Sequence, residues 1–130
     1  MKKLASGGGL VWGAFLVGFC IVGCLQFAMA MEAGESVEAF VDRVVHNSRT
    51  VVFSKSYCPY CTRAKEALDK AGYLKTGAVV VELDKHAQGP AIQNYLAKIT
   101  QQTTVPNVFV NGQHIGGCDK TLAALSKGAL

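Results

Sequence analysis

Two cysteines, Cys58 and Cys61, separate an apolar run from a helical pattern and constrain the fold more than any other feature of the chain. The run before them, residues 50–53, is β-branched and aromatic, which is typical of a buried strand. The residues after them, 62–71, have helical spacing, and Pro59 suits the first turn of a helix. A Cys-x-x-Cys at a strand-to-helix junction indicates a thiol–disulfide redox site.

The junction gives the two thiols different roles. A helix N-terminus presents unpaired N–H groups and a partial positive charge, and both stabilise a thiolate. The thiolate is the form of cysteine that attacks disulfides. Cys58, at the junction, is therefore the expected nucleophile, and Cys61, one turn into the helix, is the expected resolving thiol.

A structural zinc site is the alternative interpretation of the cysteine pair. Such a site needs four ligands, usually two cysteine pairs or a cysteine pair with a histidine pair. Residues 32–130 hold one further cysteine, Cys118, and their three histidines lack ligand spacing. The ligand count favours redox chemistry, and no metal is expected. The histidines are His46, His86 and His114.

Charge divides the 130-residue chain into two predicted parts, residues 1–31 and a domain over residues 32–130. Residues 4–31 carry no charged side chain, whereas residues 32–130 carry all nine acidic and eleven of the thirteen basic residues. The net charge of +4 is thus half from the two lysines at the N-terminus and half from the domain. That remainder is too small to indicate nucleic-acid binding.

Residues 10–31 are apolar and uncharged, and they are long enough to form a helix that crosses a bilayer, which takes about 20 residues. They predict a signal anchor or, alternatively, a signal peptide cleaved after Ala30. The anchor is favoured because the apolar core exceeds the roughly 7–15 residues of a signal peptide. Both interpretations place the domain across the membrane, in the secretory pathway.

A third interpretation is an internal start at Met29 or Met31, which would give a cytosolic protein without the apolar segment. Within that segment, Cys20 and Cys24 share one face of a helix. They are expected to pack as small apolar residues.

The apolar periodicity of residues 32–130 predicts elements in the order α-β-α-β-α-β-β-α. Asn111-Gly112 between apolar runs is a strong hairpin signal, and Asp119 is expected to cap the last helix. A strand–helix–strand unit followed by a helix and a hairpin predicts one mixed sheet of four strands with helices on both faces. The expected elements are helix 35–47, strand 50–54, helix 59–71, strand 78–83, a helix from Pro90 with Ile92, Tyr95, Leu96 and Ile99 on one face, strands 108–110 and 114–115, and a helix with Leu122 and Leu125.

Three motifs together resemble one family, in the family's order along the chain. Cys58-Pro59-Tyr60-Cys61 resembles the dithiol active site of the glutaredoxins, and Thr104-Val105-Pro106 resembles their glutathione-contacting loop. Gly116-Gly117-Cys118-Asp119 resembles their glycine-glycine-Cys-Asp turn. The resemblance covers about residues 35–127 and implies a thioredoxin-like fold.

The resemblance also assigns residues to glutathione. Val105, between Thr104 and Pro106, would pair its backbone with the cysteine of glutathione, and the bond before Pro106 would be cis. Cys118 and Asp119 would hold the γ-glutamyl end, because a helix N-terminus binds a carboxylate through free N–H groups.

Four further residues complete the implied site. Lys55 would bind the glycine carboxylate and favour the neighbouring thiolate, with a solvated loop lysine as the alternative. Gln93 matches a second carboxylate contact, with an ordinary exposed helix glutamine as the alternative. Tyr60 would flank the bound tripeptide, and Gly117 belongs to the turn that receives it.

The implied activity is that of a glutathione-dependent thiol–disulfide oxidoreductase acting on protein–glutathione mixed disulfides and on protein disulfides. The Cys58 thiolate would attack the glutathione sulfur, and a second glutathione would then release glutathione disulfide. Cys61 would resolve the intermediate formed with a protein disulfide. Glutathione is thus a co-substrate, and the protein partners are glutathionylated or disulfide-containing.

Two other functions stay open. One is a [2Fe–2S] cluster bridged across a dimer, although cluster-binding glutaredoxins more often carry Gly or Ser at the position of Pro59. The other is a luminal disulfide oxidase or isomerase, because a crossing segment would place the domain in an oxidising compartment. Membrane-anchored secretory members tend to have one active-site cysteine, whereas this chain has two. The domain is expected to be monomeric, with residues 10–31 contacting the membrane.

Overall fold

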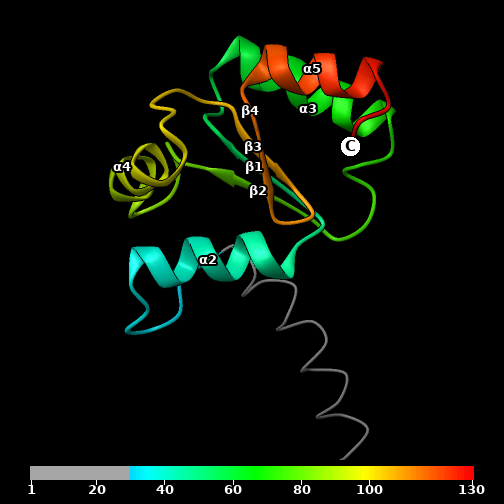
Figure 1. Ribbon diagram of the computed structural model, residues 1–130. Coiled ribbons are helices and arrows are strands. Elements are labelled where there is room, and N and C mark those ends of the chain that lie inside the picture. Colours follow the sequence, from blue (N-terminus) through cyan, green and yellow to red (C-terminus); the bar gives the residue numbers. More distant parts are fainter. Residues whose placement is uncertain (1–29) are drawn as a thin grey trace, which may run out of the picture. The chain divides into compact units, whose positions relative to one another are not determined.

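The strand expected before the cysteine pair lies inside the sheet of the computed structural model, which describes residues 30–130 (Figure 1). This strand, β1, runs from Thr50 to Ser54 and is buried throughout. It pairs in parallel with β2, Ala78–Glu82, and antiparallel with β3, Asn107–Val110. The last strand, β4, Gln113–Gly116, pairs antiparallel with β3. The strand order β2-β1-β3-β4 confirms the predicted mixed sheet of four strands.

Four helices in the described part cover the two faces of this sheet. They are α2 (Val37–Asn47), α3 (Pro59–Lys70), α4 (Gly89–Thr100) and α5 (Cys118–Ser126). α3 and α5 pack together on one face, and α2 and α4 pack together on the other (Figure 1). The element order and the two-sided covering were both predicted from the sequence.

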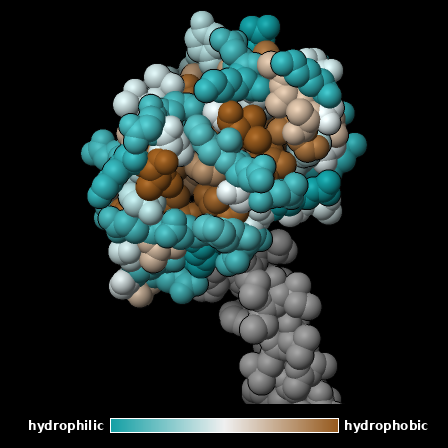
Figure 2. Space-filling view, viewed as in Figure 1, coloured by the Kyte–Doolittle hydropathy of each residue, from teal (hydrophilic) through white to brown (hydrophobic). Residues whose placement is uncertain are grey.

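Burial of the central strands explains why β1 reads as a continuous apolar run. Val51, Val52 and Phe53 have no exposed surface, because helices cover both faces of the strand that carries them. On the outside, Figure 2 shows a mostly hydrophilic surface with hydrophobic residues gathered where it is hollowed.

Local signals set the first helix and the hairpin. The Ser36 hydroxyl oxygen accepts the Ala39 N–H at 3.1 Å, which caps α2. The turn between β3 and β4 consists of Asn111 and Gly112, with φ of +52° and +78°. Positive φ at both positions is the requirement of a tight two-residue hairpin, so the Asn-Gly prediction is confirmed.

Two details of the predicted helices were wrong. Ile99 was placed on the apolar face of α4, but its side chain is 46% exposed, while Ile92 and Leu96 are buried. Asp119 was expected to cap α5, but Gly117 is the N-cap and Asp119 lies inside the first turn. The Thr121 N–H bonds to the Gly117 carbonyl at 3.0 Å, so the first turn of α5 already includes Cys118.

The predicted anchor or signal segment, residues 10–31, lies outside the described residues except for its last two positions, and so do Cys20 and Cys24. None of the helices within residues 30–130 combines the length and apolarity needed to cross a bilayer.

Candidate active site

Cys58 lies between the end of β1 and the first residue of α3, as the sequence predicted. Its N–H bonds to the Lys55 carbonyl at 3.1 Å, which turns the chain after the strand. Cys58 is the N-cap of α3, and its sulfur accepts the Cys61 N–H at 3.3 Å. One of the unpaired N–H groups at this helix end is therefore directed at the Cys58 sulfur, where it favours negative charge.

The two thiols of the pair differ in exposure. Both are free cysteines, but Cys58 is partly exposed, whereas Cys61 is completely buried. Burial, followed by a hydrogen bond with the Cys58 side chain, raises the pKa of Cys61 to about 11. Cys61 is thus a protonated thiol at neutral pH, and Cys58 is the one that an incoming disulfide can reach.

The loop before β3 approaches the cysteine pair from across the sheet. The peptide bond between Val105 and Pro106 is cis, as the resemblance implied. The Val105 carbonyl oxygen lies 4.0 Å from the Cys58 sulfur, although 47 residues separate the two positions. The fold therefore brings two of the three motifs into contact.

The glycine-glycine turn between β4 and α5 is the third motif at this site, beside the cysteine pair and the loop that carries Val105. Gly116 has φ of +126°, and a Cβ atom there would lie 2.7 Å from Cδ of Lys120. The Lys120 stem therefore occupies the space that any side chain at Gly116 would need. Cys118 is buried, which raises the pKa of its thiol, while Asp119 is exposed.

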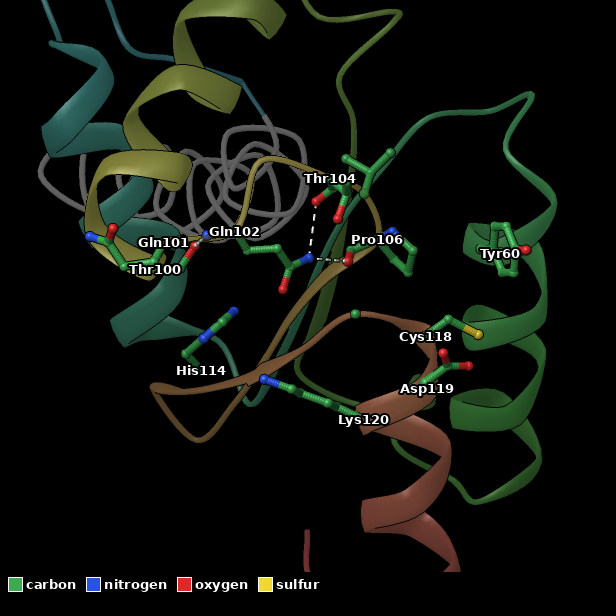
Figure 3. A pocket seen from close by; sticks show the side chains of 12 residues that line it. Tyr60, Thr100, Gln101, Gln102, Thr104, Pro106, His114, Cys118, Asp119 and Lys120 are labelled. Atoms are coloured by element: carbon green, nitrogen blue, oxygen red, sulfur yellow. Dashed lines mark hydrogen bonds between the residues drawn. The ribbon is translucent and has the colours of Figure 1, made fainter.

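A cavity of about 680 Å³ opens where the three motifs meet (Figure 3). This volume falls within the usual range for small-molecule sites. Seven predicted site residues line it: Tyr60, Thr104, Val105, Pro106, Gly117, Cys118 and Asp119.

Four predicted site residues are outside the cavity lining described for residues 30–130: Cys58, Cys61, Lys55 and Gln93. Lys55 is half-buried in the loop that precedes Cys58. The Gln93 amide nitrogen, on α4, donates to the Thr103 carbonyl oxygen at 3.0 Å. Gln93 thus contacts the loop that leads to Thr104 in this state.

Sequence reasoning missed five residues of the lining. They are Thr100, Gln101, Gln102, His114 and Lys120. Figure 3 shows Gln102 and His114 on the side of the cavity away from Tyr60 and Cys118. Gln102 lies just before Thr104, and Lys120 lies just after Asp119. This closeness to the recognised motifs is the one signal in the sequence that could have indicated Gln102 and Lys120.

His114 is a polar member of this wall. Its Nε2 lies 2.8 Å from the Asn107 side-chain oxygen, and its ring packs against Phe109 at 5.2 Å between centroids. Burial, with a smaller contribution from the Lys120 charge, lowers the pKa of His114. Because an amide oxygen only accepts, the Nε2–H of His114 donates to Asn107.

Asp84 is a further residue that the sequence analysis missed. One of its carboxylate oxygens accepts the Ser56 N–H at 2.9 Å, and the other accepts the Ser56 hydroxyl. These bonds hold the pKa of Asp84 below its usual range. Asp84 follows β2, so it ties the loop that carries Lys55 and Cys58 to the neighbouring strand.

The same fold occurs in known proteins. The family model for glutaredoxin matches residues 50–115. Glutaredoxin of Ricinus communis is 53% identical over 87 residues, which cover 67% of this chain and 82% of that protein. Glutaredoxin-1 of Rhizophagus irregularis is 46% identical over 90 residues, which cover 69% of this chain and 86% of that protein. A crystal structure of a buckwheat glutaredoxin–glutathione complex is 39% identical, with a TM-score of 0.67, and the match covers 76% of this chain and 90% of that one. These matches confirm the thioredoxin-like fold.

Proposed function

This chain belongs to the glutaredoxin family and is a glutathione-dependent thiol–disulfide oxidoreductase, and we propose that Cys58 is its nucleophile toward protein–glutathione mixed disulfides. The observation that carries the proposal is the contrast between the two thiols. Cys58 is reachable and caps α3, whereas Cys61 is buried and holds its proton. The thiolate fraction and the access of the attacking sulfur set the rate of such exchange.

The first half-reaction transfers glutathione to the enzyme. The Cys58 thiolate attacks the glutathione sulfur of the mixed disulfide, a bond forms between these two sulfurs, and the original S–S bond breaks. The protein thiolate leaves and takes a proton from water. In the second half-reaction a glutathione thiolate attacks the enzyme-bound glutathione sulfur, which releases glutathione disulfide and restores the Cys58 thiolate.

Protein disulfides follow a second route that uses both cysteines. Attack by Cys58 on a protein disulfide joins the enzyme to its substrate and frees one substrate thiolate. Cys61 then gives up its proton and attacks the Cys58 sulfur, which closes the enzyme disulfide and frees the second substrate thiolate. Two glutathione molecules reduce the enzyme disulfide and leave as glutathione disulfide.

Glutathione is proposed to bind in the cavity between the three motifs. Val105 offers its backbone to the cysteine of glutathione, and Cys118 and Asp119 receive the γ-glutamyl end. This assignment is supported by the approach of the Val105 carbonyl to the Cys58 sulfur and by the position of Asp119 in the first turn of α5. The other proposed contacts of the cavity are Tyr60, Thr104, Pro106 and Gly117.

Lys55 and Gln93 are proposed to bind the glycine carboxylate. Lys55 stands in the loop before Cys58, so its ammonium group also favours the thiolate through charge. For Gln93 to reach the ligand, its amide has to leave the Thr103 carbonyl that it contacts now. Glutathione binding through Gln93 therefore implies a side-chain rotation.

The direct test is turnover of a glutathionylated peptide with glutathione and glutathione reductase, on residues 31–130. Cys58→Ser is expected to abolish turnover. Cys61→Ser is expected to retain deglutathionylation and to lose reduction of a protein disulfide. Ser126→Ala, at the exposed C-terminal end of α5, serves as the control and is expected to retain both activities. Turnover that survives Cys58→Ser would refute the assignment.

We also propose that residues 1–31 form a signal anchor that holds a monomeric domain, residues 32–130, on the luminal side of a secretory membrane. The proposal is supported by the uncharged run after Lys2 and Lys3. Alkaline carbonate extraction of the expressed full chain tests it. Retention in the membrane pellet supports the anchor, and release of a shortened protein supports cleavage near Ala30.

A further inference from the structure

Gln102 braces the loop that carries Val105, and we propose that it is a positioning residue for glutathione binding. It does not touch the reacting sulfur atoms, and no motif used to recognise the site includes it. The inference rests on the proposed function, because it concerns the same cavity. Four features of the structure carry it: the two hydrogen bonds of the side chain, the identity of the atom that makes them, the backbone groups they leave free, and the support behind Gln102.

The Gln102 side chain holds the carbonyl groups on both sides of Val105. Its amide nitrogen donates to the Thr104 carbonyl oxygen at 3.0 Å and to the Pro106 carbonyl oxygen at 2.8 Å (Figure 3). Carbonyl oxygens only accept hydrogen bonds, so the atom between them must be the nitrogen of the amide. Its two N–H groups match the two acceptors, which uses its full donor capacity.

The brace uses neither backbone group of Val105, whose carbonyl is contacted by the Cys58 thiol. With the Thr104 and Pro106 carbonyls engaged by Gln102, the Val105 carbonyl is the one that faces the Cys58 sulfur, at 4.0 Å. Within residues 30–130, no hydrogen bond occupies the Val105 N–H. A backbone donor and acceptor at one residue are what an extended peptide needs to pair as an added strand.

Gln102 is itself supported from three elements, α4, β3 and β4. Its N–H donates to the Thr100 hydroxyl oxygen at 3.2 Å, and that hydroxyl donates to the Leu96 carbonyl at 2.6 Å within α4. The Asn107 amide nitrogen, at the start of β3, donates to the same Thr100 oxygen at 3.3 Å. His114 on β4 completes the chain by donating to the Asn107 oxygen at 2.8 Å. The brace therefore connects the loop to a helix and to two strands.

This arrangement predicts an effect on binding rather than on sulfur chemistry. A loop that is already held loses less conformational freedom when it pairs with a peptide, so the bound state costs less. Both hydrogen bonds exist without the ligand, so removing the two donors should weaken binding by only part of the worth of two neutral hydrogen bonds, and we expect about tenfold. The exchange reaction at Cys58 should keep its intrinsic rate, because Gln102 contacts neither cysteine.

Two variants of the full domain test the brace. Gln102→Met keeps the length of the side chain without its donors, and Gln102→Glu sets acceptors against the two carbonyls. Both should raise KM for a glutathionylated peptide about tenfold and leave kcat within about twofold. Gln102→Asn keeps the amide on a shorter stem that cannot reach both carbonyls, and it serves if the other variants fold poorly. Gln113→Met, at an exposed position on β4, is the matched control and should leave KM unchanged.

Two further measurements separate positioning from a general structural role. The rate of Cys58 alkylation by iodoacetamide, without glutathione, should be the same in wild type and Gln102→Met. Titration of reduced glutathione into Cys58→Ser, with and without Gln102→Met, should show the tenfold weakening by NMR without any turnover. An unchanged affinity in that titration would overturn the proposal. A rise in KM that comes with slower alkylation of Cys58 and a lower melting temperature would also overturn it, because it would indicate a general structural role.

The titration also separates this proposal from the proposed function. Absence of turnover in wild type would refute the mechanism assigned to Cys58. The affinity measured in the Cys58→Ser background would still decide the role of Gln102, because binding there needs no chemistry.

Discussion

The two ends of the sheet are built in different ways. The site end is where β1 and β2 finish, β3 starts and β4 finishes, at Ser54, Glu82, Asn107 and Gly116. The hairpin end is the opposite edge, at Thr50, Ala78, Val110 and Gln113. The hairpin end is closed by backbone hydrogen bonds, whereas the loops at the site end are held by side chains in addition to backbone bonds.

At the hairpin end, backbone groups bond to one another. The Arg49 N–H donates to the Gly77 carbonyl at 2.7 Å, and the Asn111 N–H donates to the Arg49 carbonyl at 2.7 Å. At the site end, the Asp84 carboxylate binds Ser56, and the Gln102 amide binds the loop around Val105. Side-chain bonds of this kind hold the loop around Val105 without occupying the Val105 N–H.

The largest expected effect comes from placing the same methyl group at both ends. Gly89→Ala, near the site end, would put Cβ 1.9 Å from the Leu83 carbonyl oxygen, a clash with backbone that should cost about 3 kcal/mol in unfolding free energy. Gly112→Ala, in the hairpin turn, meets open space and pays only for its φ of +78°, about 1 kcal/mol. Urea unfolding of both variants measures the difference.

Equal losses in the two variants would break the comparison. They would mean that the close approach of α4 to the segment after β2 relaxes freely, and that the site end is no tighter than the hairpin turn.

A gain in stability is expected at the hairpin end. The Thr50 hydroxyl is fully buried and has no hydrogen-bond partner within the described residues. Thr50→Val replaces it with a methyl group of similar volume, which should raise the unfolding free energy by about 1 kcal/mol. Thermal unfolding measures the change, with Thr76→Val on the exposed loop as the control. A loss of stability would show that the hydroxyl is satisfied in solution.

The smallest expected effect is a pH dependence at the site end. Because the pKa of Asp84 is lowered in the folded state, its stabilising effect is present above the usual carboxyl pKa, about 4, and is lost as pH falls through the lowered value. Wild type should therefore be more stable than Asp84→Asn at pH 7, and the difference should shrink in acid. Urea unfolding from pH 7 to pH 3, with the exposed Asp69→Asn as the control, measures it. A difference that stays constant with pH would contradict this role of the carboxylate.

The sequence predicted the elements well because their signals are local. β1 was predicted at its observed bounds, because the residues on either side of its β-branched and aromatic run do not continue the strand pattern. The place of Cys58 at the start of α3 followed from Pro59 and the helical spacing after it. The Asn111-Gly112 turn followed from the positive φ that both residues tolerate.

The braces of the site could not be predicted because they depend on contacts between distant positions. Asp84 binds Ser56 across 28 residues, and no spacing rule connects a loop after one strand with a loop after another. Ile99 was misplaced because periodicity gives the direction of an apolar face but not how far the covering neighbour extends. The cap of α5 was misassigned because the helix starts on the backbone of Gly117, where no side chain gives a signal.

The burial of Cys61 affects the lifetime of the enzyme-bound disulfide in the proposed mechanism. Burial raises the pKa of Cys61, so its thiol is mostly protonated at pH 7. In the proposed mechanism, internal attack on Cys58 is therefore slow on most encounters, and the enzyme-bound disulfide persists while a second glutathione diffuses in. The burial of the Cys61 sulfur would thus set the lifetime of the mixed disulfide at Cys58. That lifetime would determine whether Cys61 or a second glutathione resolves it.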